Sequence, residues 1–339
     1  MRSLSTVRFF ITGAAGFIGS NLVHQILGVL PDAKVLSYDA LTYAGKLENL
    51  EGALDNPNHE FIQGDIGDPG LVHAALEHFR PDVIIHLAAE THVDRSIAAA
   101  QPFIQTNIVG QTNLLMAAQD YFEKRMKDRS EIFHFIHIST DEVFGALGAD
   151  DQKFSESTPY DPRSPYSASK AASDHLVRAW QHTYELPAII LNCSNNYGPR
   201  QYPEKLIPVV ITKALSKQDI PVYGQGQNIR DWIHVDDYGR AILCAAEKGV
   251  AGQSYCIGGG NEWRNIDLVR FICKTLDELH PRKDGESYEE QIQFVTDRPG
   301  HDFRYAINSA KAREELDWQP RISFEQGLQE TIKWYLERH

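Results

Sequence analysis

The sequence predicts an α/β fold, a doubly wound parallel sheet followed by a smaller mixed α/β domain. Through the first two-thirds of the chain, short runs of β-branched and aromatic residues alternate with longer segments of helical periodicity. Such alternation is typical of a parallel sheet with helices on both faces. Glycine, proline and aromatic residues become frequent in loops after about residue 195. We therefore expect domains over 1–195 and 196–339, with some later segments returning to the first.

The individual elements follow from the same patterns. Strands are expected at 7–12, 34–38, 60–62, 83–87, 133–138 and 188–191. Residues 103–125 carry apolar side chains near helical spacing and predict a long helix. An apolar stripe over 324–336 predicts a final helix, and Ser323 with Gln326 has the pattern of a capping box at its start.

Composition excludes several classes of protein. The 33 Lys and Arg residues against 46 Asp and Glu give a net charge of −13, which argues against non-specific nucleic-acid binding. The 42% apolar and 23% charged residues are typical of a folded globular chain. The four cysteines form no disulfide framework, and we find neither a signal peptide nor an apolar run of about 18 residues. We expect a cytoplasmic protein that binds no membrane.

A glycine-rich turn directly after the first strand predicts a dinucleotide site. It has the spacing GxxGxxG and comprises Gly13, Gly16, Phe17, Ile18 and Gly19. The glycines allow a tight turn and close approach of the backbone to a pyrophosphate, and the amides of the following helix, expected from Asn21, bind the anion. We therefore expect the first sheet to be of the Rossmann type.

An acidic residue at the end of the second strand indicates which cofactor binds. Asp39 lies 20 residues beyond Gly19, where a carboxylate accepts hydrogen bonds from the adenosine ribose and repels a 2′-phosphate. No Lys or Arg follows until Lys46, so NAD is favoured over NADP. Further contacts are expected after the third and fourth strands, near the adenine at Asp65 and Ile66 and near the middle of the cofactor at Leu87, Ala88 and Ala89. Asp65 could alternatively be a simple turn residue.

Tyr166 and Lys170 lie four residues apart at the start of a predicted helix, on one face. A cation beside the phenol, together with the positive charge of an oxidised nicotinamide, favours the phenolate and lets Tyr166 act as a base near neutral pH. The same spacing is common in solvated surface pairs. The glycine turn upstream, and Thr140 at the end of the preceding strand, favour the catalytic interpretation.

The ordered set of motifs carries a specific family resemblance. The motifs occupy residues 12–20, 39–45, 88–96, 139–145, 166–170, 195–199, 203–208, 230–232 and 297–302. In these motifs the chain resembles the extended short-chain dehydrogenase/reductases that act on nucleotide sugars, and most closely their 4,6-dehydratases. Relatives that only epimerise C4 generally lack the acidic pair Asp141-Glu142.

The adjacent acids are the most informative part of this resemblance. In a regular strand Asp141 and Glu142 would point to opposite faces, but where a strand runs out into a loop both can turn toward a ligand. Eliminating water requires a base and an acid, and the pKa values of an adjacent pair can be driven apart to supply both.

The resemblance also implies a reaction. Tyr166 takes the C4 hydroxyl proton while hydride passes from C4 to NAD, with Thr140 hydrogen-bonded near the reacting oxygen. Glu142 then removes the C5 hydrogen, and Asp141 protonates the C6 hydroxyl as it leaves as water. Hydride returns to C6 and a proton to C5, which gives a 4-keto-6-deoxy sugar.

By motif match, further contacts are implied for both ligands. NAD is expected to contact Leu41, Thr42, Thr106, Tyr166, Lys170 and Asn196. The substrate is implied to be dTDP-glucose, held mainly by the second domain. Its expected contacts are Thr91, Thr140, Asn195, Lys205, Leu206, Arg230, Asn265, Arg298 and His301, with Pro221 and Tyr223 beside the base. Guanidinium forks such as those of Arg230 and Arg298 suit a pyrophosphate.

Some alternatives stay open at this point. The chain could dehydrate a UDP- or CDP-sugar, epimerise a nucleotide sugar at C4, or serve as a non-catalytic NAD-binding scaffold. Arg200 stands where an aromatic residue is frequent and is expected near the sugar-nucleotide cleft. His134 and His137 lie three apart on a strand, so they face opposite ways, and no metal is expected. The resemblance also implies a homodimer through two helices, here those over 103–125 and 166–184.

Overall fold

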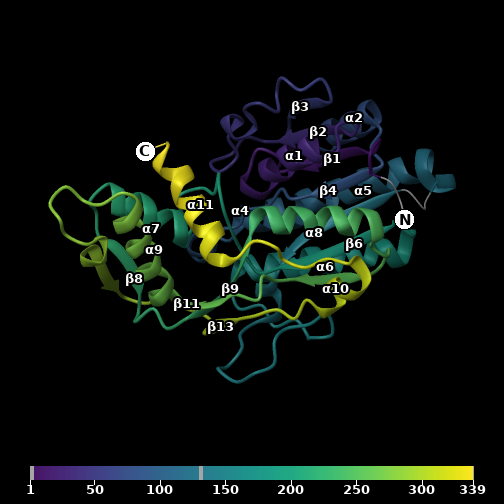
Figure 1. The fold of residues 1–339 in the computed structure, drawn as a ribbon. Helices are drawn as coiled ribbons and strands as arrows, with labels where there is room; N and C mark the ends of the chain where they lie inside the picture. The colour runs from purple at the N-terminus through teal and green to yellow at the C-terminus, as the bar shows by residue number, and fades with distance from the viewer. Residues whose placement is uncertain (1–3, 130–132, 339) are drawn as a thin grey trace.

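A seven-stranded parallel sheet forms the centre of the chain in a computed structural model that describes residues 4–129 and 133–338. Its strand order is β10-β6-β5-β4-β1-β2-β3 (Figure 1). The bounds are β1 Arg8–Thr12, β2 Lys34–Asp39, β3 His59–Gln63, β4 Val83–His86, β5 His134–Thr140, β6 Ala188–Cys193 and β10 Ser254–Ile257. The predicted doubly wound sheet is thereby confirmed, and each expected strand forms within two residues of its expected bounds.

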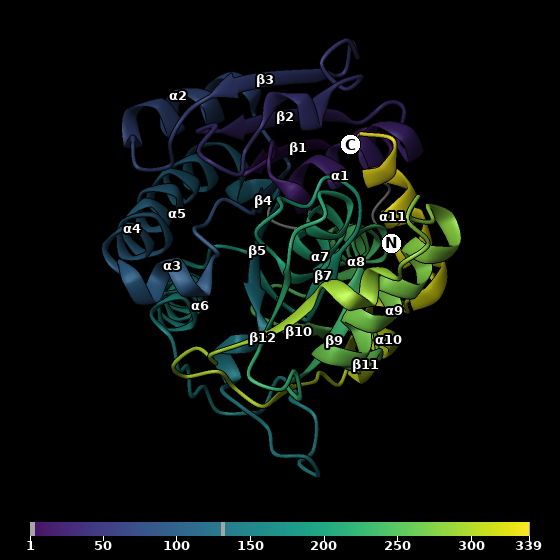
Figure 2. The same ribbon diagram turned by 90° about the vertical axis from the view of Figure 1, so that its left-hand side faces the viewer.

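Helices cover both faces of this sheet. The bounds are α1 Phe17–Val29, α2 Pro69–Phe79, α5 Gln111–Tyr121, α6 Pro165–Tyr184, α8 Val235–Lys248 and α10 Ala310–Leu316. Successive residues of β1 point to opposite faces. Phe9 and Ile11 therefore pack into the core shared with α1 and α8, while Phe10 packs into the core shared with α2 and α5. Figure 2 shows α2, α5 and α6 along one side of the molecule.

The long helix predicted over 103–125 consists of consecutive helical segments. α4 (Gln101–Ile104) runs through a π-helical stretch, Gln105–Gly110, into α5, which ends in a second such stretch, Phe122–Met126. α3 (Val93–Ala98) precedes it. Ile104, one of the apolar residues near helical spacing in this range, is 44% exposed.

The smaller part of the molecule lies to the left in Figure 1. β7 (Asn195–Tyr197), β9 (Ile229–His234), β11 (Glu262–Arg264) and β13 (Arg304–Tyr305) form one sheet, and β8 (Ile220–Tyr223) pairs with β12 (Ile292–Val295). α7 (Leu206–Leu215), α9 (Asn265–Leu279) and α11 (Phe324–Leu336) share a separate core. Short 3-10 helices cover Leu47–Leu50, Lys127–Arg129, Asp141–Phe144 and Tyr288–Gln291.

Two serine caps fix helix starts. Ser323 accepts from the Gln326 amide at 3.3 Å, but the Gln326 side chain donates to Glu330, so the expected capping box is only half made. Ser164 forms a complete box with Ser167 at the start of α6, one residue before its first helical residue, Pro165. None of the helices within 4–129 and 133–338 is long and apolar enough to span a membrane.

Candidate active site

The glycine turn packs backbone against backbone at the carboxyl ends of β1 and β4. Gly13 has φ +67°, and a Cβ there would lie 2.6 Å from the amide nitrogen of Ala88. A Cβ on Gly19 would lie 2.2 Å from the Gly13 carbonyl oxygen. α1 begins at Phe17, earlier than the expected Asn21, and no side chain caps its first amides because Gly16 is the N-cap. These amides therefore suit a pyrophosphate.

Asp39 lies beside this turn. Its Oδ2 accepts from the Ala15 amide and its Oδ1 from the Leu41 amide, each at 2.8 Å. Burial raises the pKa of Asp39, and the two amide bonds oppose that rise. Each carboxylate oxygen keeps a second lone pair for a ribose hydroxyl.

The other residues expected around a dinucleotide differ in their surroundings. Asp65 is exposed and accepts from the Gly67 amide at 2.7 Å, which is the turn role considered as the alternative. Ile66 is buried, Thr42 is exposed, and a half-buried set comprises Phe17, Ile18, Leu41, Leu87, Ala88, Ala89 and Thr106. The Asn196 Oδ1 atom is buried with no partner among the described residues. The unpartnered oxygen of Asn196, the first amides of α1 that no side chain caps, and the close backbone packing at Gly13 together fit NAD.

The acidic pair lies where β5 ends. Thr140 closes the strand, and its Oγ1 accepts from the Glu142 amide at 3.3 Å, so the chain turns at once into the 3-10 helix over Asp141–Phe144. Asp141 is only 2% exposed, and its Oδ2 finds no partner within the described parts of the chain. β5 thus ends just before Asp141 and Glu142, as expected if both side chains turn toward a ligand.

Asp141 and Glu142 lie in different electrostatic environments. Burial raises the pKa of Asp141 well above its usual range, and the charges of Glu142 and Asp231 add to that rise. Burial also raises the pKa of Glu142, but three cations oppose it: Lys205, Arg230 and Arg298. Asp141 is therefore the group that keeps its proton, and Glu142 is the one that ionises more readily.

Tyr166 and Lys170 lie beside this pair in the first turns of α6. Tyr166 is 8% exposed. Burial, and next the charge of Glu142, raise the pKa of Tyr166 well above its usual value, while a hydrogen bond with Thr140 lowers it. The protein by itself therefore does not lower the pKa of Tyr166, and the expected shift toward the phenolate would need the positive charge of the bound cofactor. Lys170 donates to the Ile138 carbonyl at 2.7 Å, and burial lowers its pKa to about 8.

Three cations expected at the substrate already have protein partners. Arg230 donates to the Ile229 carbonyl at 2.7 Å and to the Asp302 carbonyl at 3.0 Å, and its guanidinium lies 4.1 Å from the centre of the Tyr305 ring. Lys205 donates to the Thr91 carbonyl at 2.8 Å. Arg298 donates to Asp94 Oδ1 at 3.2 Å. All three act on Glu142, and Arg230 also acts on Asp141.

The remaining expected substrate contacts lie on the smaller part of the molecule. Pro221 and Tyr223 belong to β8, and the Tyr223 hydroxyl donates to Asp94 Oδ2 at 3.1 Å. His301 contacts Asp297 at 2.7 Å and packs edge-on against Tyr223. Asn195 and Asn265 each have a buried side-chain oxygen without a partner in the described regions, as a bound ligand would explain, and Leu206 begins α7.

Arg200, expected near the sugar-nucleotide cleft, bonds to α1. It takes φ +68° and donates to Asn21 Oδ1 at 2.9 Å. Asn21 in turn donates to the Pro199 carbonyl at 2.9 Å. Arg200 therefore fastens the loop after β7 to α1. In the described ranges no group of three His, Cys, Asp or Glu side chains could hold a metal ion.

Sequence reasoning assigned no role to several residues of the site. Asp94 binds both Arg298 and Tyr223, and the buried Asp231 acts on Asp141. Asp174 lies four residues beyond Lys170 on the same helix, a spacing visible in the sequence that could have identified it. The contacts of Asp94 depend on segments far apart in the chain and carried no such local signal.

Comparisons with known proteins agree with this geometry. Residues 10–331 match the family described as GDP-mannose 4,6 dehydratase. The dTDP-glucose 4,6-dehydratase of Neisseria gonorrhoeae is 52% identical over 99% of this chain and 98% of its own. The structure of the dTDP-glucose 4,6-dehydratase DesIV from Streptomyces venezuelae, solved with NAD, is 43% identical, with a TM-score of 0.87 over 97% of each chain.

The fold is shared more widely than this activity. The UDP-glucose 4-epimerase of Thermotoga maritima, solved with UDP-glucose, is 27% identical, with a TM-score of 0.85 over 98% of this chain and 99% of its own. The identity to the dehydratases is much higher, and the resemblance read from the motifs is confirmed. The chain therefore belongs to the GDP-mannose 4,6-dehydratase family and, within it, groups with the dTDP-glucose 4,6-dehydratases.

Proposed function

We propose that this chain is an NAD-dependent hydro-lyase that converts dTDP-glucose into dTDP-4-keto-6-deoxy-glucose, an early step in making deoxysugars. The observation that carries the proposal is the pair of buried Asp141 and half-buried Glu142 beside Tyr166, with the pKa of Asp141 raised the more strongly. Such a pair supplies the proton donor and the base that elimination of water requires. The relatives' dTDP-glucose 4,6-dehydratase activity supports the same conclusion.

NAD is the proposed cofactor, held by the glycine turn, the first amides of α1 and Asp39. When bound, it supplies the acceptor for the C4 hydride and returns that hydride to C6. The neighbouring dehydratase structure solved with NAD supports this assignment. Asp39 favours NAD because its carboxylate would repel a 2′-phosphate.

The steps assigned to the protein follow the order of the groups at the end of β5. Tyr166 accepts the proton of the sugar C4 hydroxyl, and the nearby hydroxyl of Thr140 hydrogen-bonds that oxygen. Lys170 stabilises the negative charge that forms on the phenol oxygen of Tyr166.

The acidic pair then carries out the elimination. Glu142 removes the C5 hydrogen, which the 4-keto group acidifies. Asp141 gives its proton to the departing C6 hydroxyl, so that the bond from C6 to oxygen breaks and water leaves. A protonated Asp141 at neutral pH is what its burial and the charge of Glu142 favour.

The dTDP moiety is assigned from the relatives, and the experiment that tests it compares three nucleotides. The purified enzyme is incubated with dTDP-, UDP- and CDP-glucose in parallel, and the products are weighed by mass spectrometry. We expect loss of one water from dTDP-glucose at the highest rate. Faster dehydration of UDP- or CDP-glucose would reassign the nucleotide.

The same experiment separates the other candidate functions. A 4-epimerase would convert its substrate with no change of mass. A non-catalytic scaffold would retain NAD and turn over none of the three. Because the epimerase neighbour shares the whole fold, only the acids at 141 and 142 favour dehydration over epimerisation on structural grounds.

A cytoplasmic homodimer is the proposed form of the enzyme. Ile104, Val109 and Met116 lie along the helical run from α4 to α5 with 44, 41 and 55% of their surface exposed, and Tyr184 at the end of α6 is 40% exposed. Large apolar side chains gathered on one pair of helices are typical of an interface. Sedimentation of the wild type should give a dimer, and Met116→Glu should shift it toward the monomer. A monomeric wild type would contradict the proposal.

A further inference from the structure

Tyr166, Lys170 and Asp174 recur every four residues along α6, so that all three lie on one face of the helix. Asp174 is fully buried, and Lys170 is 4% exposed. A buried carboxylate is costly unless it is paired and hydrogen-bonded. The proposed mechanism uses Tyr166 and Lys170 but gives Asp174 no task.

The surroundings of Asp174 are those of an ionised carboxylate. Its Oδ2 atom accepts from Ser139 Oγ at 2.8 Å, from Tyr160 Oη at 2.7 Å and from Asn192 Nδ2 at 3.3 Å. Its Oδ1 atom lies 3.1 Å from His137 Nε2. Burial tends to raise the pKa of Asp174, but His137, Lys170 and Tyr160 outweigh it and lower the pKa.

His137 stands between this carboxylate and Lys170. The same Nε2 atom lies 3.1 Å from Asp174 Oδ1 and 3.4 Å from Lys170 Nζ. Burial, and then the charge of Lys170, lower the pKa of His137 to about 4, so the ring is neutral near pH 7. A neutral imidazole has one N–H, and Nε2 can serve only one of its two neighbours. The ring therefore lies between a donor, Lys170, and an acceptor, Asp174, and its Nε2 atom bonds one of them at a time.

Lys170 has two protein neighbours at hydrogen-bond distance. It donates to the Ile138 carbonyl at 2.7 Å and lies 3.4 Å from His137 Nε2, which leaves an N–H group for Tyr166 and the bound ligands. The charge of Lys170 then depends on the buried negative charge of Asp174 beyond the ring.

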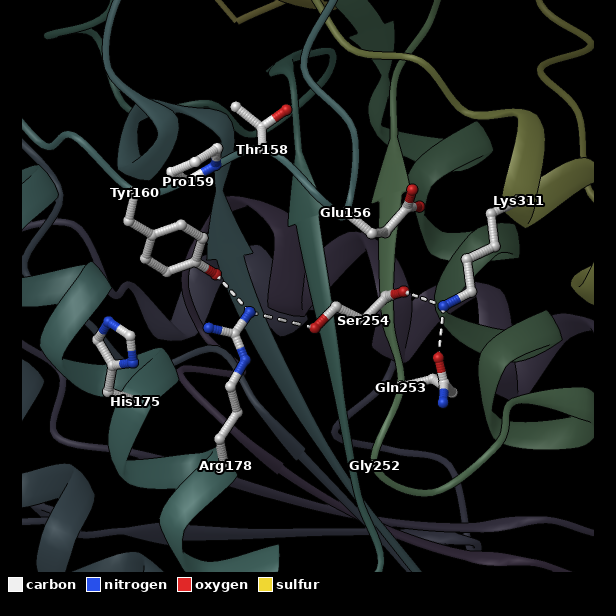
Figure 3. Close-up of a pocket in the computed structure, with 10 residues that line it drawn as sticks. All are labelled: Glu156, Thr158, Pro159, Tyr160, His175, Arg178, Gly252, Gln253, Ser254 and Lys311. Carbon is white, nitrogen blue, oxygen red and sulfur yellow. Dashed lines mark hydrogen bonds between the residues drawn. The ribbon is translucent and has the colours of Figure 1, made fainter.

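The far side of the cluster is fastened to the protein surface. The Tyr160 hydroxyl, which donates to Asp174, accepts from Arg178 Nη2 at 2.9 Å. Figure 3 shows both side chains in a surface pocket of about 570 Å³, with Arg178 reaching on to Ser254. The wall of this pocket holds Tyr160 in place over Asp174.

We infer that Asp174 is a positioning residue for the proposed reaction, whose buried carboxylate acts through His137 to keep Lys170 charged and in place one helical turn beyond Tyr166. The inference rests on the proposed dehydration, because Lys170 acts there through Tyr166. The titratable groups that act on Lys170 or Asp174 from the surrounding elements are His86, His137, Tyr160 and Cys193. Arg178 acts on His137 and Tyr160, which both contact Asp174.

The expected effect of losing Asp174 is a shift in the pH profile. The first hydride transfer requires protonated Lys170, so its rate falls as the pH rises through the pKa of Lys170, about 8. Asp174 raises that pKa, so Asp174→Asn lowers it and moves the alkaline limb to lower pH. A shift of about one pH unit would lower the rate roughly fivefold at pH 8 and leave it nearly unchanged at pH 6.

The experiment follows reduced nicotinamide absorbance in single turnovers with dTDP-glucose between pH 5.5 and 9.5. All variants carry Glu142→Gln, which blocks elimination, so that only C4 oxidation is observed. Ser173→Ala is the matched control, because Ser173 is the buried neighbour of Asp174 on α6 and its hydroxyl donates to the carbonyls of Asn107 and Ser169. We expect its alkaline limb to coincide with that of the parent.

The outcomes are separable. An unshifted alkaline limb in folded Asp174→Asn overturns the inference, even if the rate falls at every pH, because a merely structural role would scale the whole profile. If that variant is not recovered folded, Asp174→Glu and Asp174→Gln make the same comparison at equal size. Only the Glu variant should keep the limb near that of the parent. Failure of the wild type to release water from any nucleotide glucose would instead overturn the proposed function.

Discussion

Arg298 donates to the Asp94 carboxylate at 3.2 Å and so joins two segments 204 residues apart in the chain. A substrate diphosphate offers the same guanidinium a stronger, more highly charged acceptor. Arg298→Met should therefore raise KM for the nucleotide sugar about 10- to 100-fold, the worth of a hydrogen bond to a charged group, with a smaller effect on kcat. Steady-state kinetics measure both.

Arg270→Met is the control for this prediction. Arg270 pairs with Glu289 at 2.9 Å on the exposed side of α9, away from the acidic pair. Its KM should equal that of the wild type. A fall in kcat with unchanged KM in Arg298→Met would show that Arg298 does not hold the diphosphate in the ground state.

Glu142→Gln and Asp141→Asn should separate oxidation from elimination. Each removes one proton-transferring group and keeps the size of the side chain, so water loss should slow by about 10²- to 10⁴-fold. C4 oxidation should stay measurable, and reduced nicotinamide should accumulate in a single turnover. Glu290→Gln, an exposed acid far along the chain, serves as control. Normal turnover in both variants would show that the roles are misassigned.

Tyr166→Phe should block the reaction one step earlier. It keeps the ring that packs edge-on against Phe103 but removes the oxygen that accepts the C4 proton. Single-turnover formation of reduced nicotinamide should slow by about 10²- to 10⁴-fold, with little change in substrate affinity. Oxidation at the wild-type rate would assign the base to another residue.

Gly13→Ala should weaken NAD binding and the fold together. The new Cβ would meet the Ala88 amide at 2.6 Å in a backbone with φ +67°, a strain of about 1 to 3 kcal/mol. Thermal unfolding and NAD titration measure the two effects. Gly28→Ala is the control. Gly28 lies on α1, the helix that follows the glycine turn, and a Cβ there would meet nothing within 4 Å. The substitution should leave NAD affinity unchanged and stabilise the helix by up to about 1 kcal/mol. Equal NAD affinity in Gly13→Ala and Gly28→Ala would contradict the proposal that the glycine turn holds NAD.

The ends of β1 to β6 were predictable because their signals are local, whereas the order of the strands in the sheet was not predicted. Buried parallel strands read as short apolar runs, and the glycine turn, Asp39 and the Tyr166-Lys170 spacing each lie within one segment. Contacts between distant segments were not predictable in this way. Arg200 was expected near the sugar-nucleotide cleft, but its bond to Asn21 depends on how the whole loop after β7 is placed.

Electrostatic roles were only partly predictable. The adjacency of Asp141 and Glu142 is visible in the sequence, but the charge of Asp231 beside the first acid and the three cations around the second come from other segments. The pKa of Tyr166 shows the same limit. The sequence suggests a lowered value from Lys170, whereas burial and Glu142 raise it.

The central claim, that the acidic pair makes this active site a dehydratase, is tested most directly in deuterated water. The wild-type enzyme converts dTDP-glucose in D₂O. The product is then returned to H₂O under conditions that exchange only hydroxyl deuterons, and its mass is measured at once by mass spectrometry. The account predicts a product that has lost one water and carries one deuterium on carbon, at C5, because the proton removed there is replaced from solvent. A product of unchanged mass without carbon-bound deuterium would contradict it.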